Sequence, residues 1–313
     1  MSVVGSRVAV LGATGHVGKC LSAALLGDGT HDVTTVARDS VALARFLAAV
    51  PGGAAARRSS FEEFPGCEFD VVLNCVGVGN PESIIALGAE VFDLTERFDR
   101  MVMEYLGRHP ESMCVSISSG AIYGEFSAPG DGTTPGLADR ASLTPREYYG
   151  QAKLASELRH REASDQHIVD LRLFGFFSRY ADVQARSLMG DIVRAVSRRD
   201  VVTVTADDVI RDYVDPDDLA ELLRCVMRAT PCNGVFDVYS AAPVGKFALL
   251  DAFAERYGIS YTVEQAPDVP EATGDKPMYY STDRGAATIG YEPRWTSLEA
   301  LFRATDALVP GAS

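Results

Sequence analysis

The chain has 313 residues, of which 47% are hydrophobic and 23% charged, which is sufficient for a large core and a smaller appended domain. The formal net charge of −14 produces a field that repels nucleic acid and anionic membranes, so we expect neither as a partner. Six cysteines are scattered without a CxxC pair or a Cys/His cluster, and no uncharged apolar run reaches the length of a membrane-spanning helix. These features predict a cytoplasmic protein with reduced thiols and no metal site.

The first expected strand, residues 7–11, and the helix expected over 17–26 enclose a glycine turn, GATGHVG. Glycines in such a turn permit close backbone approach to a pyrophosphate, and the amides at the following helix N-terminus favour its negative charge. The pattern therefore predicts a dinucleotide site. The candidate cofactor-binding residues are Gly12, Thr14, Gly15, His16, Val17 and Gly18. We interpret His16 as a turn residue and not as an acid or base.

The end of the second expected strand, residues 32–37, bears on which dinucleotide is bound. An NAD-preferring site places an acid there to bind the ribose hydroxyls, whereas this chain has Ala37 followed by Arg38. Because a guanidinium pairs bidentately with a 2′-phosphate, Arg38 favours NADP(H), with NAD(H) as the alternative. In the other interpretation Arg38 is an ordinary surface charge. Asp39 is expected to cap the helix over 41–50.

Apolar runs continue to alternate with helical patterns along the chain. Further strands are expected at 69–76, 113–117, 168–174 and 235–239, with a weak one near 54–57 and a long helix over 90–106. Continuous apolar strands separated by amphipathic helices indicate a parallel sheet covered on both faces. The expected fold class is therefore α/β, a doubly wound parallel (Rossmann) sheet with a smaller C-terminal α+β substrate domain. The expected dinucleotide-binding domain comprises 1–174 with a return segment 212–239, and the substrate-binding domain comprises 175–211 and 240–313.

The stretch EYYGQAK, residues 147–153, follows a segment rich in Gly, Pro and Ser, 125–144, which we interpret as a long functional loop. On a helix, Tyr149 and Lys153 project from the same face one turn apart, whereas Tyr148 is rotated away. An ammonium ~4 Å from the phenol, at an effective dielectric near ~20, favours phenolate by roughly 4 kcal/mol, or about three pKa units, before desolvation opposes it. The spacing thus predicts a lowered pKa for Tyr149.

These motifs occur with VSISSGAIYG (115–124), IRDYVDPDDLAELL (210–223) and STDRGAATIGYEP (281–293). Together they resemble the extended short-chain dehydrogenase/reductases, the NAD(P)-dependent epimerase/dehydratase family, over almost the whole chain. The resemblance implies that Tyr149 is the general acid/base and that Lys153 tunes it and holds the nicotinamide ribose. It also implies that Ser119 binds the substrate oxygen, with Ser118 as the less favoured neighbour. By analogy with the family we expect a homodimer.

Other positions follow from the same resemblance. Cys75 and Gly77 are expected to approach the cofactor from the end of the strand over 69–76. Dehydratases of the family carry an Asp-Glu pair directly after the hydroxyl position, where this chain has Gly120 and Ala121. Without that acid and base, dehydration is not expected.

The expected substrate contacts are cationic. Arg211 matches the family arginine that contacts the substrate diphosphate, and a guanidinium suits such a group. In the other interpretation Arg211 makes a structural pair with Asp212 or Asp215. Arg179 is a weaker phosphate candidate. Asp215 stands where the family commonly has a histidine, and we do not expect it to be catalytic.

The resemblance implies NADPH-dependent reduction of a nucleotide-linked 4-keto(deoxy)sugar, with Tyr149 as the general acid. The alternative in the same superfamily is an NAD-dependent nucleotide-sugar 4-epimerase, against which Arg38 argues. A third interpretation, from another class, is an NADP-sensing regulator without catalysis. Such a protein would not need Ser119, Tyr149 and Lys153 together.

Overall fold

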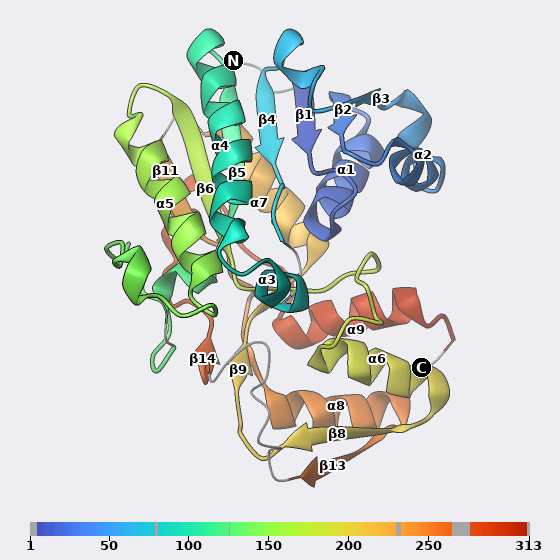
Figure 1. The fold of residues 1–313 in the computed structure, drawn as a ribbon. Helices are drawn as coiled ribbons and strands as arrows, with labels where there is room; N and C mark the ends of the chain where they lie inside the picture. The colour runs from blue at the N-terminus through green and yellow to red at the C-terminus, as the bar shows by residue number, and fades with distance from the viewer. Residues whose placement is uncertain (1–4, 79–80, 125, 230–232, 265–275, 312–313) are drawn as a thin grey trace.

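The computed structural model describes residues 5–78, 81–124, 126–229, 233–264 and 276–311. A seven-stranded parallel sheet runs through it in the order β11-β6-β5-β4-β1-β2-β3 (Figure 1). Its strands are β1 Arg7–Leu11, β2 Asp32–Val36, β3 Arg57–Ser59, β4 Val71–Asn74, β5 Met113–Ser119, β6 His167–Leu173 and β11 Gly234–Asp237. This confirms the predicted doubly wound α/β fold. The predicted strands are present except that the one over 69–76 is shortened at both ends and the weak one near 54–57 is displaced to β3, because residues 53–55 form a short 3-10 helix.

Helices cover both faces of this sheet. They are α1 His16–Asp28, α2 Ser40–Ala48, α3 Pro81–Leu87, α4 Glu90–Arg108, α5 Tyr148–Glu162 and α7 Pro216–Arg228. Side chains of β1 alternate between the two faces, as the two-residue period of a strand requires. Val8 and Val10 face the core under α1 and α7. Ala9 and Leu11 face the core under α4.

The chain after β6 builds a second group of elements beside the carboxyl edge of the sheet (Figure 1). It contains α6 Leu188–Arg198, β8 Val201–Thr205, α8 Lys246–Tyr257, β13 Ser260–Glu264 and α9 Ser297–Leu308, which share a hydrophobic core of their own. Two small sheets join this group to the main sheet: β7 Gly175–Phe176 with β10 Tyr213–Val214, and β12 Val244–Gly245, β9 Ile210–Arg211 and β14 Met278–Tyr279. We propose that the domain boundaries expected from the sequence divide the chain at these sheets.

The loop after β5 is held against the C-terminal segment. The loop follows the short helix η3 Gly120–Tyr123. In it, Phe126 O accepts a hydrogen bond from Met278 N (3.2 Å). Gly130 N donates to Tyr280 O (2.9 Å), and Gly130 O accepts from Thr282 N (2.8 Å). Residues from the far end of the chain therefore lie against the end of β5. Within the described residues, no helix is both long and apolar enough to cross a membrane.

Candidate active site

The glycine turn joins β1 to α1 and leaves the helix N-terminus open. Gly12 has φ 75°, which favours glycine, and a Cβ added at Gly18 would lie 2.2 Å from Gly12 O. The N-cap residue is Gly15, without a side-chain cap, and the first turn of α1 holds no acidic residue. Amides at that end are thus available to an anion. The backbone fits the pyrophosphate of a dinucleotide, and Thr14 and Val17 are half-buried beside it.

His16 connects this turn to the segment after β7. Its Nε2 lies 2.7 Å from Ser178 Oγ, and its ring centroid is 4.9 Å from that of Phe176. Burial lowers the pKa of His16 to about 4, so the imidazole is neutral at physiological pH. A neutral ring in these contacts ties the turn to the second group of elements.

Arg38 follows β2 directly and is exposed. The neighbouring Asp39 accepts hydrogen bonds from Val41 N (3.0 Å) and Ala42 N (2.8 Å), so it caps α2 as predicted. In the adjacent strand β3, Arg58 is paired with Thr35 of β2 and is also exposed. The edge where a 2′-phosphate would approach therefore carries the exposed Arg38 and Arg58, and the neighbouring Arg57 is exposed but paired with Asp32.

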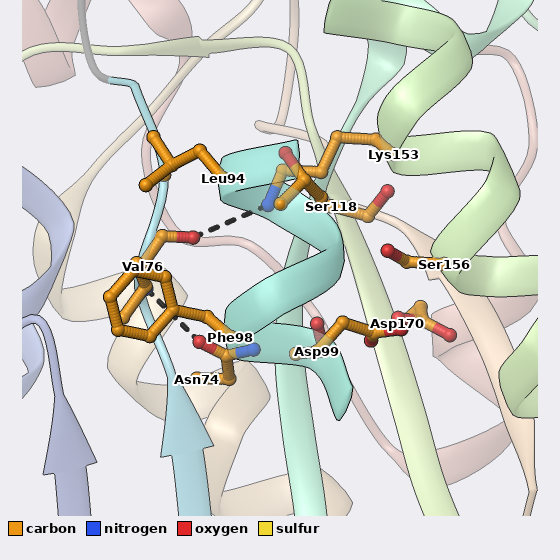
Figure 2. A pocket seen from close by; sticks show the side chains of 12 residues that line it. Asn74, Val76, Leu94, Phe98, Asp99, Ser118, Lys153, Ser156 and Asp170 are labelled. Carbon is orange, nitrogen blue, oxygen red and sulfur yellow. Dashed lines mark hydrogen bonds between the residues drawn. The ribbon is translucent and has the colours of Figure 1, made fainter. Parts of the chain in front are cut away.

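Lys153 is buried between the ends of β4 and β5. Its Nζ donates to Ile117 O (2.8 Å) and Val76 O (3.5 Å), and Figure 2 shows it extending over the residues of a small cavity. A Cβ added at Gly77 would lie 3.6 Å from this Nζ, so the end of β4 approaches the ammonium closely. Burial lowers the pKa of Lys153, and the charges of Asp170 and Asp99 oppose that fall.

The two carboxylates beneath Lys153 share a buried histidine. His160 Nε2 lies 2.6 Å from Asp99 Oδ1, and its Nδ1 lies 2.9 Å from Asp170 Oδ1. Burial opposes protonation, but the two carboxylates prevail and raise the pKa of His160 to about 9. The cavity between them and Lys153 measures about 10 Å³, roughly what one water molecule needs.

Tyr149 and Ser119 face each other across the end of β5. Burial raises the pKa of Tyr149 to about 12, and a hydrogen bond with Ser119 opposes that rise. This differs from the lowered pKa predicted from the Tyr149–Lys153 spacing. The physical reason is that the ammonium donates to the carbonyl oxygens of Ile117 and Val76, so desolvation of the phenol dominates. Tyr148 points elsewhere and packs edge-on against Phe92 of α4.

Ser118 points to the opposite side of β5. Its hydroxyl donates to Glu157 of α5, which in turn pairs with Arg172 of β6 (2.7 Å). Arg172 also donates to Tyr123 Oη (2.9 Å) and lies 3.6 Å from Asp237 of β11. We call these five residues the Arg172 cluster. Because Ser118 is committed to it, Ser119 is the serine that faces Tyr149.

Two glycines set the spacing around the reaction centre. A Cβ added at Gly150 would lie 2.2 Å from Ala121 O, so α5 sits directly on η3 and brings Tyr149 to Ser119. A Cβ added at Gly120 would lie 2.3 Å from the ring of Phe174. The position after Ser119 is therefore closed to a carboxylate side chain, in agreement with the sequence argument against dehydration.

On the substrate side, β9 and β14 place Arg211, Lys276 and Tyr279 together. Arg211 pairs with Tyr279 in register and donates to Lys276 O (2.5 Å). The guanidinium carbon of Arg211 is 5.8 Å, and Nζ of Lys276 5.1 Å, from the Tyr279 ring centroid. Burial and the charge of Arg211 lower the pKa of Lys276 to about 8. Two cations side by side in an acidic protein can bind an anion.

Asp212 and Asp215, the alternative partners for Arg211, form hydrogen bonds with other residues. Asp212 accepts from Ser240 N (3.1 Å) and Ser297 Oγ (3.0 Å). Asp215 caps α7 and accepts from Arg303 Nε (2.8 Å). Neither contact involves Arg211.

The structure brings the predicted residues together unequally. Ser119, Tyr149 and Arg211 converge, whereas Arg179 is exposed and lies near α1, where its charge acts on Cys20. Cys75 follows β4, and a Cβ added at Gly12 would lie 3.0 Å from its carbonyl oxygen. Sequence reasoning missed Lys276 and Tyr279, which belong to no motif; the only available signal was a lysine and an aromatic pair just before STDRG.

The chain is similar to known proteins over most of its length. The profile described as "NAD dependent epimerase/dehydratase family" matches residues 8–240. A dTDP-6-deoxy-L-talose 4-dehydrogenase (NAD(P)(+)) from Kitasatospora kifunensis is 27% identical, covering 95% of this chain and 93% of that protein.

Among solved structures, a UDP-glucose-4-epimerase from Stenotrophomonas maltophila with bound NAD superposes with a TM-score of 0.79 at 19% identity, covering 97% of each chain. MoeE5 in complex with UDP-glucose and NAD superposes with a TM-score of 0.78 at 19% identity, covering 98% of this chain and 100% of that one. At these identities the two structures establish the fold.

Proposed function

Because the chain belongs to the NAD dependent epimerase/dehydratase family, and so is an NAD(P)-dependent oxidoreductase, we propose that it reduces the 4-keto group of a nucleotide-linked (deoxy)sugar with NADPH. The observation that carries this proposal is the convergence of Ser119 and Tyr149 beside a pair of cations, Arg211 and Lys276. The relative from Kitasatospora kifunensis supports it, because its name describes the reverse reaction, oxidation at C4 of a dTDP-6-deoxysugar.

Each residue has a defined task in this reaction. Bound NADPH supplies a hydride to the carbonyl carbon of the sugar. Tyr149 gives its phenolic proton to the carbonyl oxygen, so that the product is the C4 hydroxyl. A pKa of about 12 keeps this phenol protonated at neutral pH, which suits an acid in the reductive direction. Ser119 donates to the same oxygen as negative charge develops on it.

The remaining residues bind the substrate and the cofactor or exclude a competing reaction. Arg211 and Lys276 bind the diphosphate of the nucleotide, which places the sugar over Ser119. Lys153 holds the nicotinamide ribose near Gly77. The ring of Phe174 fills the place where a carboxylate would be needed for elimination of water, so the reaction stops at reduction.

The test is an assay of NADPH oxidation with dTDP-, UDP-, GDP- and CDP-linked 4-keto-6-deoxysugars, on the wild type and on Tyr149→Phe. We expect one of these substrates to be reduced, and the substitution to lower kcat by about 10³–10⁴-fold without a change in the melting temperature. Interconversion of C4 epimers by protein that retains NAD through gel filtration would instead establish the epimerase. An unchanged rate in Tyr149→Phe would contradict the proposed acid.

Cofactor preference is tested separately at Arg38. Removing its guanidinium in Arg38→Ala should weaken NADPH binding about tenfold, the effect of losing roughly 1.4 kcal/mol of ion pairing, and leave NADH binding nearly unchanged. The matched control is Arg45→Ala in α2, a basic residue in the last turn of that helix. Equal loss of NADPH and NADH affinity, or no loss of either, would refute the proposed 2′-phosphate contact.

A further inference from the structure

Tyr279 presents its hydroxyl to the serine of the reaction centre. It lies on β14, 160 residues from Ser119 in the sequence, and its Oη is 3.3 Å from Ser119 Oγ. Ser119 Oγ also accepts a hydrogen bond from Ala121 N (3.2 Å), and its interaction with the Tyr149 phenol opposes the rise in the pKa of that phenol. Three groups thus share one serine hydroxyl.

A serine hydroxyl has one proton to donate and two lone pairs to accept with. The Ala121 amide occupies one lone pair, since a backbone N–H can only donate. If Tyr279 occupies the other, the single proton of Ser119 is directed to the side where Tyr149 and the sugar oxygen lie. Without Tyr279, the hydroxyl is free to rotate between acceptors.

We propose that Tyr279 is a positioning residue that fixes the direction of the Ser119 hydrogen bond toward the reacting oxygen and the phenol of Tyr149. This inference rests on the proposed function and adds a residue to it. Tyr279 acts through Ser119 and transfers no proton to the substrate.

The surroundings of Tyr279 suit a hydrogen-bond donor of fixed orientation. Its ring packs edge-on against Phe126 (4.7 Å between centroids) and Phe174 (5.4 Å). Its backbone is held by the register of β14 with β9. Burial raises the pKa of Tyr279 to about 12, so the phenol remains protonated and able to donate. The ring contacts would survive in phenylalanine, and only the hydroxyl contact would be lost.

The next residue provides a matched control. Tyr280 is half-buried on the same segment, and its backbone forms hydrogen bonds with Met278 and Gly130. Tyr280→Phe therefore removes a hydroxyl from the next residue along the chain, just after β14, while the backbone contacts stay.

The first experiment is kinetic and uses a double-mutant cycle. Tyr279→Phe should lower kcat about tenfold, equivalent to about 1.4 kcal/mol, with little change in KM. In the Ser119→Ala background, Tyr279→Phe should not lower kcat further, because the serine hydroxyl through which Tyr279 acts is already absent. Tyr280→Phe should match the wild type. Additive losses in the cycle, or equal losses in Tyr279→Phe and Tyr280→Phe, would overturn the proposal.

The second experiment does not depend on turnover. Tyrosines labelled with ¹³C at Cζ are titrated by NMR in protein saturated with NADP⁺, and the Tyr149 signal is assigned from Tyr149→Phe. A hydrogen bond donated to the phenolate favours ionisation, so Tyr279→Phe should raise the titration midpoint of Tyr149, and Tyr280→Phe should not. An identical midpoint in wild type and Tyr279→Phe, or no titration in either, would overturn the role of Tyr279. If only the sugar assay failed, the proposed function would be refuted. The NMR titration would still decide whether Tyr279 acts on Tyr149 through Ser119.

Discussion

Two polar clusters meet at the carboxyl end of β5, and they differ in whether their members carry charge. On one side, Ser118 belongs to the Arg172 cluster, in which Arg172 and Glu157 are 1% and 2% exposed and directly paired. On the other side, Ser119 faces Tyr149 and Tyr279, two phenols that burial keeps neutral. Adjacent residues of a strand face opposite sides, so one strand end serves both clusters.

The difference indicates what each side is for. Buried ions are tolerated only when paired and hydrogen-bonded, and their geometry is then rigid. The Arg172 cluster joins β5, β6, β11 and α5 and so fixes the scaffold. Neutral hydroxyls with incomplete hydrogen bonding cost less to bury than unpaired ions do. They can also respond to charge that develops on a bound substrate. We therefore expect damage to the first cluster to reduce stability, and damage to the second to reduce rate.

The largest expected effect is on stability. Arg172→Met would leave Glu157 and Asp237 buried without their cation and should lower the free energy of unfolding by about 3–5 kcal/mol. The comparison is Arg57→Met, which removes an exposed ion pair with Asp32 (2.8 Å) and should cost at most about 1 kcal/mol. Urea unfolding measures both. Similar losses in the two variants would show that the Arg172 cluster contributes no more than a surface pair.

Ser118 and Ser119 are adjacent in β5 but belong to different clusters, so substituting each one compares the two clusters directly. Ser119→Ala should lower kcat/KM by about 10²-fold, the usual effect of losing a donor to a developing oxyanion, with an unchanged melting temperature. Ser118→Ala should leave kcat/KM within about threefold and cost about 1 kcal/mol of stability, the usual value for one hydrogen bond. Steady-state kinetics and thermal unfolding decide this. The reverse pattern would exchange the roles of the two residues.

The smallest expected effect is on the pH dependence of ligand binding. A diphosphate between Lys276 and Arg211 would raise the pKa of Lys276 from about 8, so binding takes up a proton where the free lysine is deprotonated. Affinity for dTDP or UDP should be full below pH 8 and fall about three- to tenfold from pH 7 to pH 9. Lys276→Arg keeps its charge and should lose this dependence. Calorimetric Kd values that follow the same pH curve in both proteins would rule out Lys276 as the source.

The main sheet was predictable because local signals and the tertiary environment agree there. Strand β5 is a mostly apolar run ending in two serines, and the glycine turn stands between an expected strand and an expected helix. The pairing of Tyr149 with Lys153 on one helical face followed from spacing alone. The direction of the tyrosine pKa did not, because it depends on where the ammonium points, and carbonyl oxygens of β4 and β5 compete for it.

Residues that arrive from distant parts of the chain were not predictable. Tyr279 reaches Ser119, and Lys276 reaches Arg211, only because β14 pairs with β9, two short strands without a periodic signal. Tyr123 of η3 and Asp237 of β11 likewise meet Arg172 through contacts between elements that are separate in the sequence. Sequence spacing constrains neighbours on one element, whereas these contacts depend on how elements are docked.

The contact between Gly120 and Phe174 also restricts how this chain could acquire a different chemistry. Since a Cβ at position 120 would lie 2.3 Å from the Phe174 ring, an aspartate there requires a smaller residue at 174 at the same time. Neither change is useful alone: the first overfills the core, and the second leaves a hole beside Tyr279. A change of this site toward elimination of water therefore requires both substitutions together.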